Sequence, residues 1–153
     1  MSCLNKRELP LEEMMPLIKE RLLEGSEIRI SPKGTSMLPM LRQGKDSVIL
    51  SPIPEKLKKY DIPLYKRDDG KYVLHRIVKL GDTFECMGDN QFSLEKNIRK
   101  DQMIALVTAF YRGENLWKTE NLVYRLYCIF WYRSRNLRKL LKRVKNKISR
   151  IKS

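Results

Sequence analysis

The sequence has few of the residues that build metal centres and disulfide frameworks. It contains a single histidine, His75, and three cysteines, Cys3, Cys86 and Cys128. The cysteines are odd in number and widely spaced, and they form neither a CxxC pair nor a zinc-binding spacing. We therefore expect free thiols in a reducing compartment, with no bound metal and no cofactor.

Long apolar runs are also missing. The N-terminal stretch MSCLNKRELPLEE has no apolar core and soon turns acidic, which is untypical of a secretory signal peptide. The longest apolar-rich stretch, 122–132, is interrupted by Arg125 and falls short of the roughly 20 residues that span a bilayer. These absences predict a cytoplasmic location, with the inner membrane surface as the candidate attachment.

Acidic residues are absent from the last part of the chain. Residues 121–153 contain eleven Lys and Arg and no Asp or Glu, so this segment carries +11 of the formal charge of +14. The preceding residues are nearly neutral in sum. The basic character therefore belongs to the C-terminal segment, and the main part of the chain need not bind polyanions.

The chain is long enough for one domain, since 42% of its 153 residues are hydrophobic. Near the N-terminus, apolar residues recur at the spacing of a helix that stops at Gly25: Leu11, Met14, Met15, Ile18 and Leu22. Runs rich in β-branched and aromatic residues, separated by turn signals, predict strands at 27–32, 46–52, 61–67, 71–80, 82–88 and 103–112.

From residue 116 onward the pattern becomes helical. Apolar residues there form one stripe, and Lys and Arg fill the other faces: Leu137, Leu140, Leu141, Val144, Ile148 and Ile151. The sequence thus predicts a mainly β protein in three parts. These are an N-terminal amphipathic helix in 1–26, a β domain in 27–115 and a long basic amphipathic helical tail in 116–153.

The stretch GTSMLPML places Ser36 between a glycine-led turn and Pro39. A serine hydroxyl is a weak nucleophile until a base removes its proton, and His75 is the one imidazole available. In a strand, His75 would share a face with Val73 and Ile77, which favours the neutral, proton-accepting form. Taken alone, each residue is typical of a structural role, as a loop hydroxyl or a half-buried histidine.

A base also needs a carboxylate that accepts its other N–H. Asp89, in the stretch MGDNQ, follows a predicted strand after His75. Gly-Asp-Asn is also ordinary turn chemistry, so Asp89 alone indicates an Asx turn as readily as a catalytic acid.

Three stretches in order carry more information than any one of them: GTSMLP at 34–39, LHRIV at 74–78 and GDN at 88–90. Together they resemble the boxes of the type I signal peptidase and LexA-like serine peptidases. The resemblance covers roughly residues 27–110, and YDIPLY at 60–65 fits the strand that this family places before its base. It implies the family's β-strand core as the fold of the β domain.

The resemblance also implies roles for individual residues. Ser36 would be the nucleophile, and the backbone N–H groups of Thr35 and Ser36 would form the oxyanion hole. His75 would be the general base, as in the Ser-His branch found in endoplasmic-reticulum, archaeal and spore-former signal peptidases. Its neighbour Arg76 is expected to support the structure. No metal or cofactor is implied.

The acid that orients His75 is left open by the sequence. The Ser-His branch carries a second acidic residue a few positions after its Gly-Asp-Asn box, and here the nearest candidate is Glu95, followed by Lys96 and Asn97. We favour Asp89 over Glu95, because the box residue itself matches. The family also usually carries an N-terminal transmembrane anchor, where this chain has a short amphipathic helix.

We weigh three roles for the basic tail: binding a membrane surface, packing on the β domain and binding nucleic acid. Aromatic residues precede its polybasic part: Tyr124, Tyr127, Phe130, Trp131 and Tyr132. Aromatic side chains at a lipid boundary, with Lys and Arg facing anionic headgroups, are typical of an interfacial helix. We therefore rank an anionic membrane surface, bound through 121–153, first. Packing of the apolar stripe on the β domain ranks second and nucleic acid third.

These patterns favour a serine endopeptidase that cleaves a peptide or protein precursor, and a cytoplasmic precursor would agree with the expected location. The alternative is a non-catalytic scaffold with the peptidase fold that binds peptide, or membrane through the basic tail. A regulator that binds nucleic acid or cleaves itself in the LexA manner is the third class.

Overall fold

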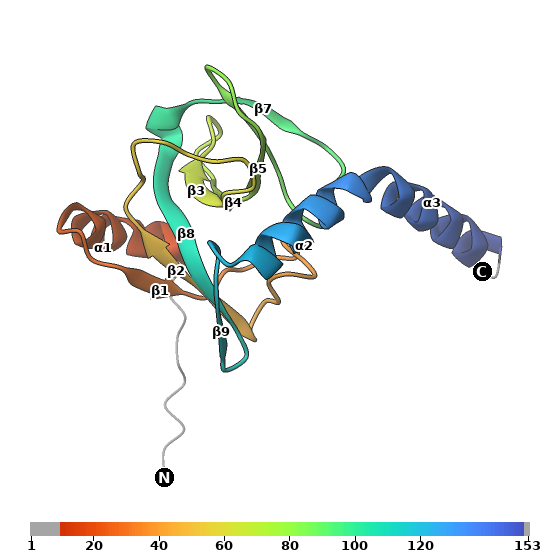
Figure 1. Cartoon of the computed structure of the whole chain (residues 1–153), viewed down its shortest axis with the longest axis horizontal. Coiled ribbons are helices and arrows are strands. Elements are labelled where there is room, and N and C mark those ends of the chain that lie inside the picture. The colour runs from red at the N-terminus through yellow and green to blue at the C-terminus, as the bar shows by residue number, and fades with distance from the viewer. Residues whose placement is uncertain (1–9, 152–153) are drawn as a thin grey trace, which may run out of the picture.

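The computed structural model describes residues 10–151 of the chain. Most of them form two antiparallel β-sheets, with one helix before the strands and two after them (Figure 1). The predicted mainly β organisation is confirmed at this level. Cys86 and Cys128 are buried free thiols, while Cys3 lies outside the described residues.

The larger sheet has the strand order β1-β2-β8-β3-β4, and β9 also pairs with β8. Its strands are β1 (Ile28–Ile30), β2 (Asp46–Ser51), β3 (Pro63–Lys66), β4 (Tyr72–Leu74), β8 (Met103–Arg112) and β9 (Asn115–Lys118). The long strand β8 is the centre, because β2 lies along one edge while β3 and β9 pair with its other edge at opposite ends. Its burial alternates over most of its length, as expected of a strand with one face on the core.

The smaller sheet has the order β5-β6-β7, with β5 (Arg76–Lys79), β6 (Phe84–Met87) and β7 (Glu95–Ile98). A short 3-10 turn, Lys100–Gln102, leads from β7 into β8. The two sheets enclose a second cluster of buried side chains: Tyr65, Ile77, Cys86, Ile98 and Met103.

Helix α1 (Leu11–Leu23) covers the larger sheet with Met15, Ile18 and Leu22, all buried as the helical spacing predicts. Full burial of a side chain of this size contributes about 1.5–3 kcal/mol. Helix α2 (Leu122–Arg133) adds the buried residues Tyr124 and Cys128 to the same core. Helix α3 (Arg135–Ile151) follows α2 and extends away from the sheets (Figure 1).

Three local predictions are wrong. The expected strand 71–80 is two strands in different sheets, β4 and β5, and the chain leaves the first sheet at His75. Residues 116–118, expected to be helical, continue β9, and the tail contains two helices separated at Ser134. Strand β7 was not predicted, because EKNI has neither alternation nor apolar residues before its end.

Of the three helices described, none combines the length and apolar character that crossing a bilayer requires.

Candidate active site

Ser36 opens a tight turn that spans residues 36–40 rather than a regular helix. The backbone N–H of Leu41 donates to the carbonyl of Met37 at 3.0 Å, which closes the turn. Met37, Met40 and Leu41 are buried in the main core, while Ser36 itself is half-buried. The large apolar residues that follow Ser36 in GTSMLPML therefore fix the turn on the core and leave the serine at its surface.

His75 lies at the junction between β4 and β5, where the chain passes from one sheet to the other. Its side chain is only 2% exposed. The Nδ1 atom of His75 lies 2.9 Å from Oε1 of Glu95, the first residue of β7. Because a carboxylate only accepts, this contact assigns the imidazole proton to Nδ1 and leaves a lone pair on Nε2.

Glu95 is held by Tyr65 of β3 and by Arg67, which directly follows that strand. The Tyr65 hydroxyl donates to Oε2 of Glu95 at 2.7 Å, and the Arg67 Nε donates to the same oxygen at 2.8 Å. A second Arg67 nitrogen donates to Oε1, so the guanidinium binds the carboxylate in a bidentate fashion. Tyr65 and Arg67 reach one carboxylate because side chains two apart on an extended chain point the same way.

The charge states follow from these contacts. Burial lowers the pKa of His75, and the neighbouring Glu95 carboxylate only partly offsets this effect. Burial acts to raise the pKa of Glu95, but hydrogen bonds from Arg67 and Tyr65 outweigh it and hold that pKa below its ordinary value. At neutral pH, His75 is therefore neutral and Glu95 is ionised.

Asp89 occupies a different position from the one that the sequence favours. Both of its carboxylate oxygens accept from Arg76, at 2.8 Å from Nε and 2.7 Å from a terminal nitrogen. The two side chains are 2% and 3% exposed. A buried guanidinium requires a carboxylate partner, and Asp89 is the partner of Arg76. The acid that contacts His75 is Glu95. The expectation that Asp89 orients His75 is corrected in favour of the alternative.

The rest of the Gly-Asp-Asn stretch ties its loop to the serine turn. The backbone N–H of Asn90 donates to the Ser36 carbonyl at 2.8 Å, and its side-chain amide donates to the Thr35 carbonyl at 3.2 Å. A methyl group on Gly88 would lie 2.6 Å from the Ser36 carbonyl oxygen and 3.1 Å from Nε2 of His75. Only glycine allows the loop, the serine turn and the imidazole to approach this closely.

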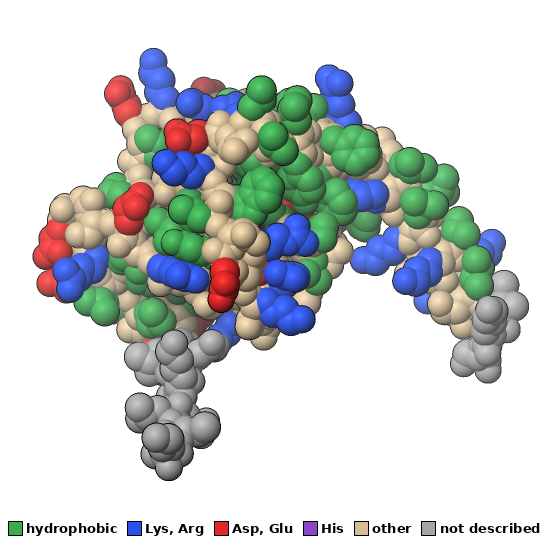
Figure 2. All heavy atoms as spheres, turned by 60° about the horizontal axis from the view of Figure 1, so that its bottom comes forward, with side chains coloured by type: hydrophobic (Ala, Val, Ile, Leu, Met, Phe, Trp, Pro, Cys, Tyr) green, Lys and Arg blue, Asp and Glu red, His purple; other side chains and the backbone are tan. Residues whose placement is uncertain are grey.

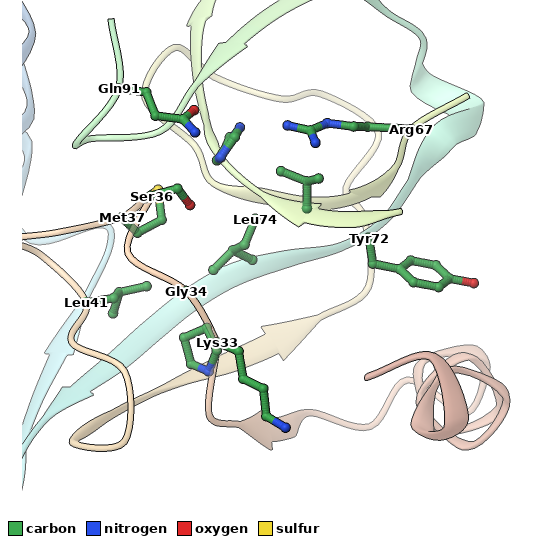
Figure 3. Close-up of a pocket in the computed structure, with 12 residues that line it drawn as sticks. Lys33, Gly34, Ser36, Met37, Leu41, Arg67, Tyr72, Leu74 and Gln91 are labelled. Atoms are coloured by element: carbon green, nitrogen blue, oxygen red, sulfur yellow. The ribbon is translucent and has the colours of Figure 1, made fainter. Parts of the chain in front are cut away.

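Ser36 and His75 line one pocket of about 210 Å³. Its wall also includes Arg67, Gln91 and the whole of β4. Figure 3 shows Ser36 and Gln91 on one side of the pocket and Arg67 reaching toward them from the opposite side. Within residues 10–151, the backbone N–H groups of Thr35 and Ser36 have no hydrogen-bond partner, so they are free to bind an oxygen atom.

The structure therefore brings Ser36, His75 and Glu95 to one site and places Asp89 in a structural ion pair. Sequence reasoning missed Tyr65 and Arg67. The signal that could have found them is the alternation in DIPLYKR, which puts both on one face of a predicted strand. Among the described side chains, no group of three or more His, Cys, Asp or Glu residues is arranged to hold a metal ion.

No protein-family model, curated protein or solved structure matches this chain.

Proposed function

We propose that this protein is a serine endopeptidase of the signal-peptidase type, which cleaves a peptide or protein precursor. Ser36 is the nucleophile, His75 the general base and Glu95 the acid that orients His75. The observation that carries the proposal is the shared pocket of Ser36 and a buried, neutral His75 whose Nδ1 is fixed by a carboxylate.

The resemblance to signal peptidases and LexA-like peptidases gains support from this geometry. Stretches 34–39, 74–78 and 88–90 are far apart in the sequence, yet each contributes to the same site. We therefore also propose the family's β-strand core as the fold of the two sheets.

In the proposed reaction, His75 Nε2 accepts the Ser36 hydroxyl proton as the serine oxygen attacks the scissile carbonyl carbon. The carbonyl π electrons move to oxygen, and the Thr35 and Ser36 N–H groups stabilise the resulting oxyanion. Each such donor contributes roughly 3–4 kcal/mol in other enzymes. His75 then protonates the leaving amine as the C–N bond breaks, and water hydrolyses the acyl-enzyme by the same steps.

The Ser36 hydroxyl makes no hydrogen bond to His75 or to any other residue between 10 and 151. The nucleophile must therefore turn onto Nε2 when substrate binds. Catalytic hydrogen bonds commonly tighten only in the substrate complex.

The position of β4 favours an extended peptide as the substrate. This strand is the edge of the larger sheet, where it pairs with β3 alone, and its three residues line the pocket. A peptide that adds to the free edge as a further strand would pass beside Ser36, with its backbone held by strand hydrogen bonds.

The test compares protein N-termini by mass spectrometry in cells that carry the wild type or Ser36→Ala. We expect a discrete set of termini to vanish in the variant, and their sequences would identify the substrate. Ser31→Ala, an exposed serine outside the pocket, is the matched control and keeps those termini. If folded, expressed Ser36→Ala leaves every terminus unchanged, the proposal fails and the non-catalytic scaffold replaces it.

A further inference from the structure

Helices α2 and α3 expose a row of large apolar side chains. On α3 these side chains are 48% to 59% exposed: Leu137, Leu140, Leu141, Val144 and Ile148. On α2 they are 57% to 71% exposed: Leu122, Val123, Leu126 and Phe130. Isolated surface leucines are ordinary, but nine such residues on two consecutive helices form an extended apolar surface that needs a partner.

The exposed residues share one side of the helices. On α3 their spacing of three and four residues puts them on one face. Successive exposed residues on α2, at 122, 126 and 130, are four apart and lead into this face. Figure 2 shows hydrophobic side chains in a row along the arm that ends at the C-terminus, with basic side chains beside them. We call this row the apolar stripe.

The remaining faces of α3 are strongly basic. They carry Arg135, Arg138, Lys139, Lys142, Arg143, Lys145, Lys147 and Arg150. No acidic residue follows position 120, and none of the ion pairs among the described residues involves α3. The α3 part of the apolar stripe is thus flanked by positive charge that no ion pair among the described residues neutralises.

The opposite face of α2 attaches the pair of helices to the β domain. Arg76 donates to the Tyr124 hydroxyl at 2.8 Å and to the Cys128 sulfur at 2.9 Å, and the Trp131 indole donates to the Asp89 carbonyl at 2.9 Å. The aromatic residues Tyr124 and Trp131, expected from the sequence at a lipid boundary, instead fix α2 beside the site. Packing of the α3 stripe on the β domain, the second expectation for the tail, is not what the structure contains.

The chemistry of this surface distinguishes between its possible partners. A second copy of the chain would bring two strongly basic helices together, so like charges would oppose the contact. A nucleic acid would bind the charges but leave the apolar stripe in water. An anionic lipid surface satisfies both features, because apolar side chains enter the acyl boundary while Lys and Arg remain among the headgroups.

We infer that α2 and α3 dock the protein on an anionic membrane surface through the apolar stripe and the basic residues beside it. The inference does not rest on catalysis by Ser36, since no residue of the proposed triad belongs to this surface. Docking would hold the pocket at the membrane, because α2 is bonded to the Asp89 loop that joins the serine turn.

The experiment is sedimentation of the full-length protein with vesicles of phosphatidylcholine alone or mixed with phosphatidylserine. We expect binding to the mixed vesicles that weakens as salt is added. The double variant Leu140→Glu/Leu141→Glu should abolish this binding, and Lys145→Gln/Lys147→Gln should weaken it by roughly ten- to thirtyfold. All four positions are exposed, so their substitution should leave the domain folded, which circular dichroism checks.

Matched controls lie away from the stripe. Leu17→Glu changes an exposed leucine of α1, and Lys56→Gln/Lys58→Gln removes two exposed lysines from a loop; both should bind as the wild type does. Ser36→Ala should also bind normally, which separates this test from the test of peptidase activity.

Three results would overturn the inference. The first is no sedimentation with the mixed vesicles. The second is equal binding by wild type and Leu140→Glu/Leu141→Glu, since charge alone, as in nucleic-acid binding, would then suffice. The third is a dimer, detected by light scattering, that the same double variant dissociates, because the stripe would then be an interface between two copies.

Discussion

His75 Nδ1 lies 2.9 Å from Glu95 Oε1, a contact that joins the β4–β5 junction to the start of β7. The carboxylate is at the same time gripped by Arg67 and by the Tyr65 hydroxyl. The imidazole is therefore oriented from one side by a hydrogen-bonded network, and its Nε2 faces the loop that carries Gly88.

Replacement of this carboxylate should impair catalysis more than folding. We expect Glu95→Gln to lower kcat by about 10²–10⁴-fold, the usual contribution of general acid–base catalysis, because the Nδ1 proton loses its charged acceptor. The measurement is the cleavage rate of the peptide whose terminus depends on Ser36. The control is Glu85→Gln on β6, which removes an acid bonded to Lys79 outside the pocket and should keep full activity. Equal rates in both variants would contradict the role of Glu95.

The pH profile should report His75. Only the neutral imidazole can accept a proton, so kcat/KM should fall as pH drops through the pKa of His75. Burial lowers that pKa, which puts the acidic limb below the ordinary histidine value of about 6.5. A limb above that value would contradict the assignment.

Two substitutions should move this limb in opposite directions. Glu95 raises the His75 pKa by its charge, whereas Arg67 lowers it. Glu95→Gln should therefore shift the acidic limb to lower pH, and Arg67→Gln should shift it to higher pH. Residues with a merely structural role would change the rate without this pair of opposed shifts.

The Asp89–Arg76 pair should contribute to stability. Asp89→Ala leaves a guanidinium buried without its carboxylate, and we expect the free energy of unfolding in urea to fall by about 3–5 kcal/mol. The comparison is Asp101→Ala, which removes an exposed partner of Arg99 and should cost about 0–1 kcal/mol. Similar free energies of unfolding for the two variants would show that the buried pair stabilises the fold no more than an exposed pair does.

A side chain at Gly88 should separate the nucleophile from its base. In Gly88→Ala the methyl group meets the Ser36 carbonyl at 2.6 Å, so the serine turn must shift. A displacement of about 1 Å can cost about 10²-fold in rate, and we expect a loss of that order in kcat. Gly81→Ala is the control. Its added methyl group would lie 3.3 Å from the nearest atom, the Thr83 carbonyl oxygen, and the variant should retain nearly full activity. An active Gly88→Ala would argue against the tight convergence of this loop on Ser36.

The elements with strong periodicity could be predicted from the sequence. The spacing of Met15, Ile18 and Leu22 predicted α1. The ten-residue run 103–112, rich in β-branched and aromatic residues, predicted β8 with its observed ends. Such patterns are local, because each records which face of one element meets the core.

Tertiary structure alone decided which carboxylate serves His75. Asp89 and Glu95 both follow His75 in the sequence, and neither has a local pattern that reveals its partner. The choice follows from two arginines. Arg76 is buried on β5 and pairs with Asp89, while Arg67, directly after β3, holds Glu95 against the imidazole. The strand break at His75 has the same origin, since the chain must change sheets there, and only the packing of the two sheets fixes that point.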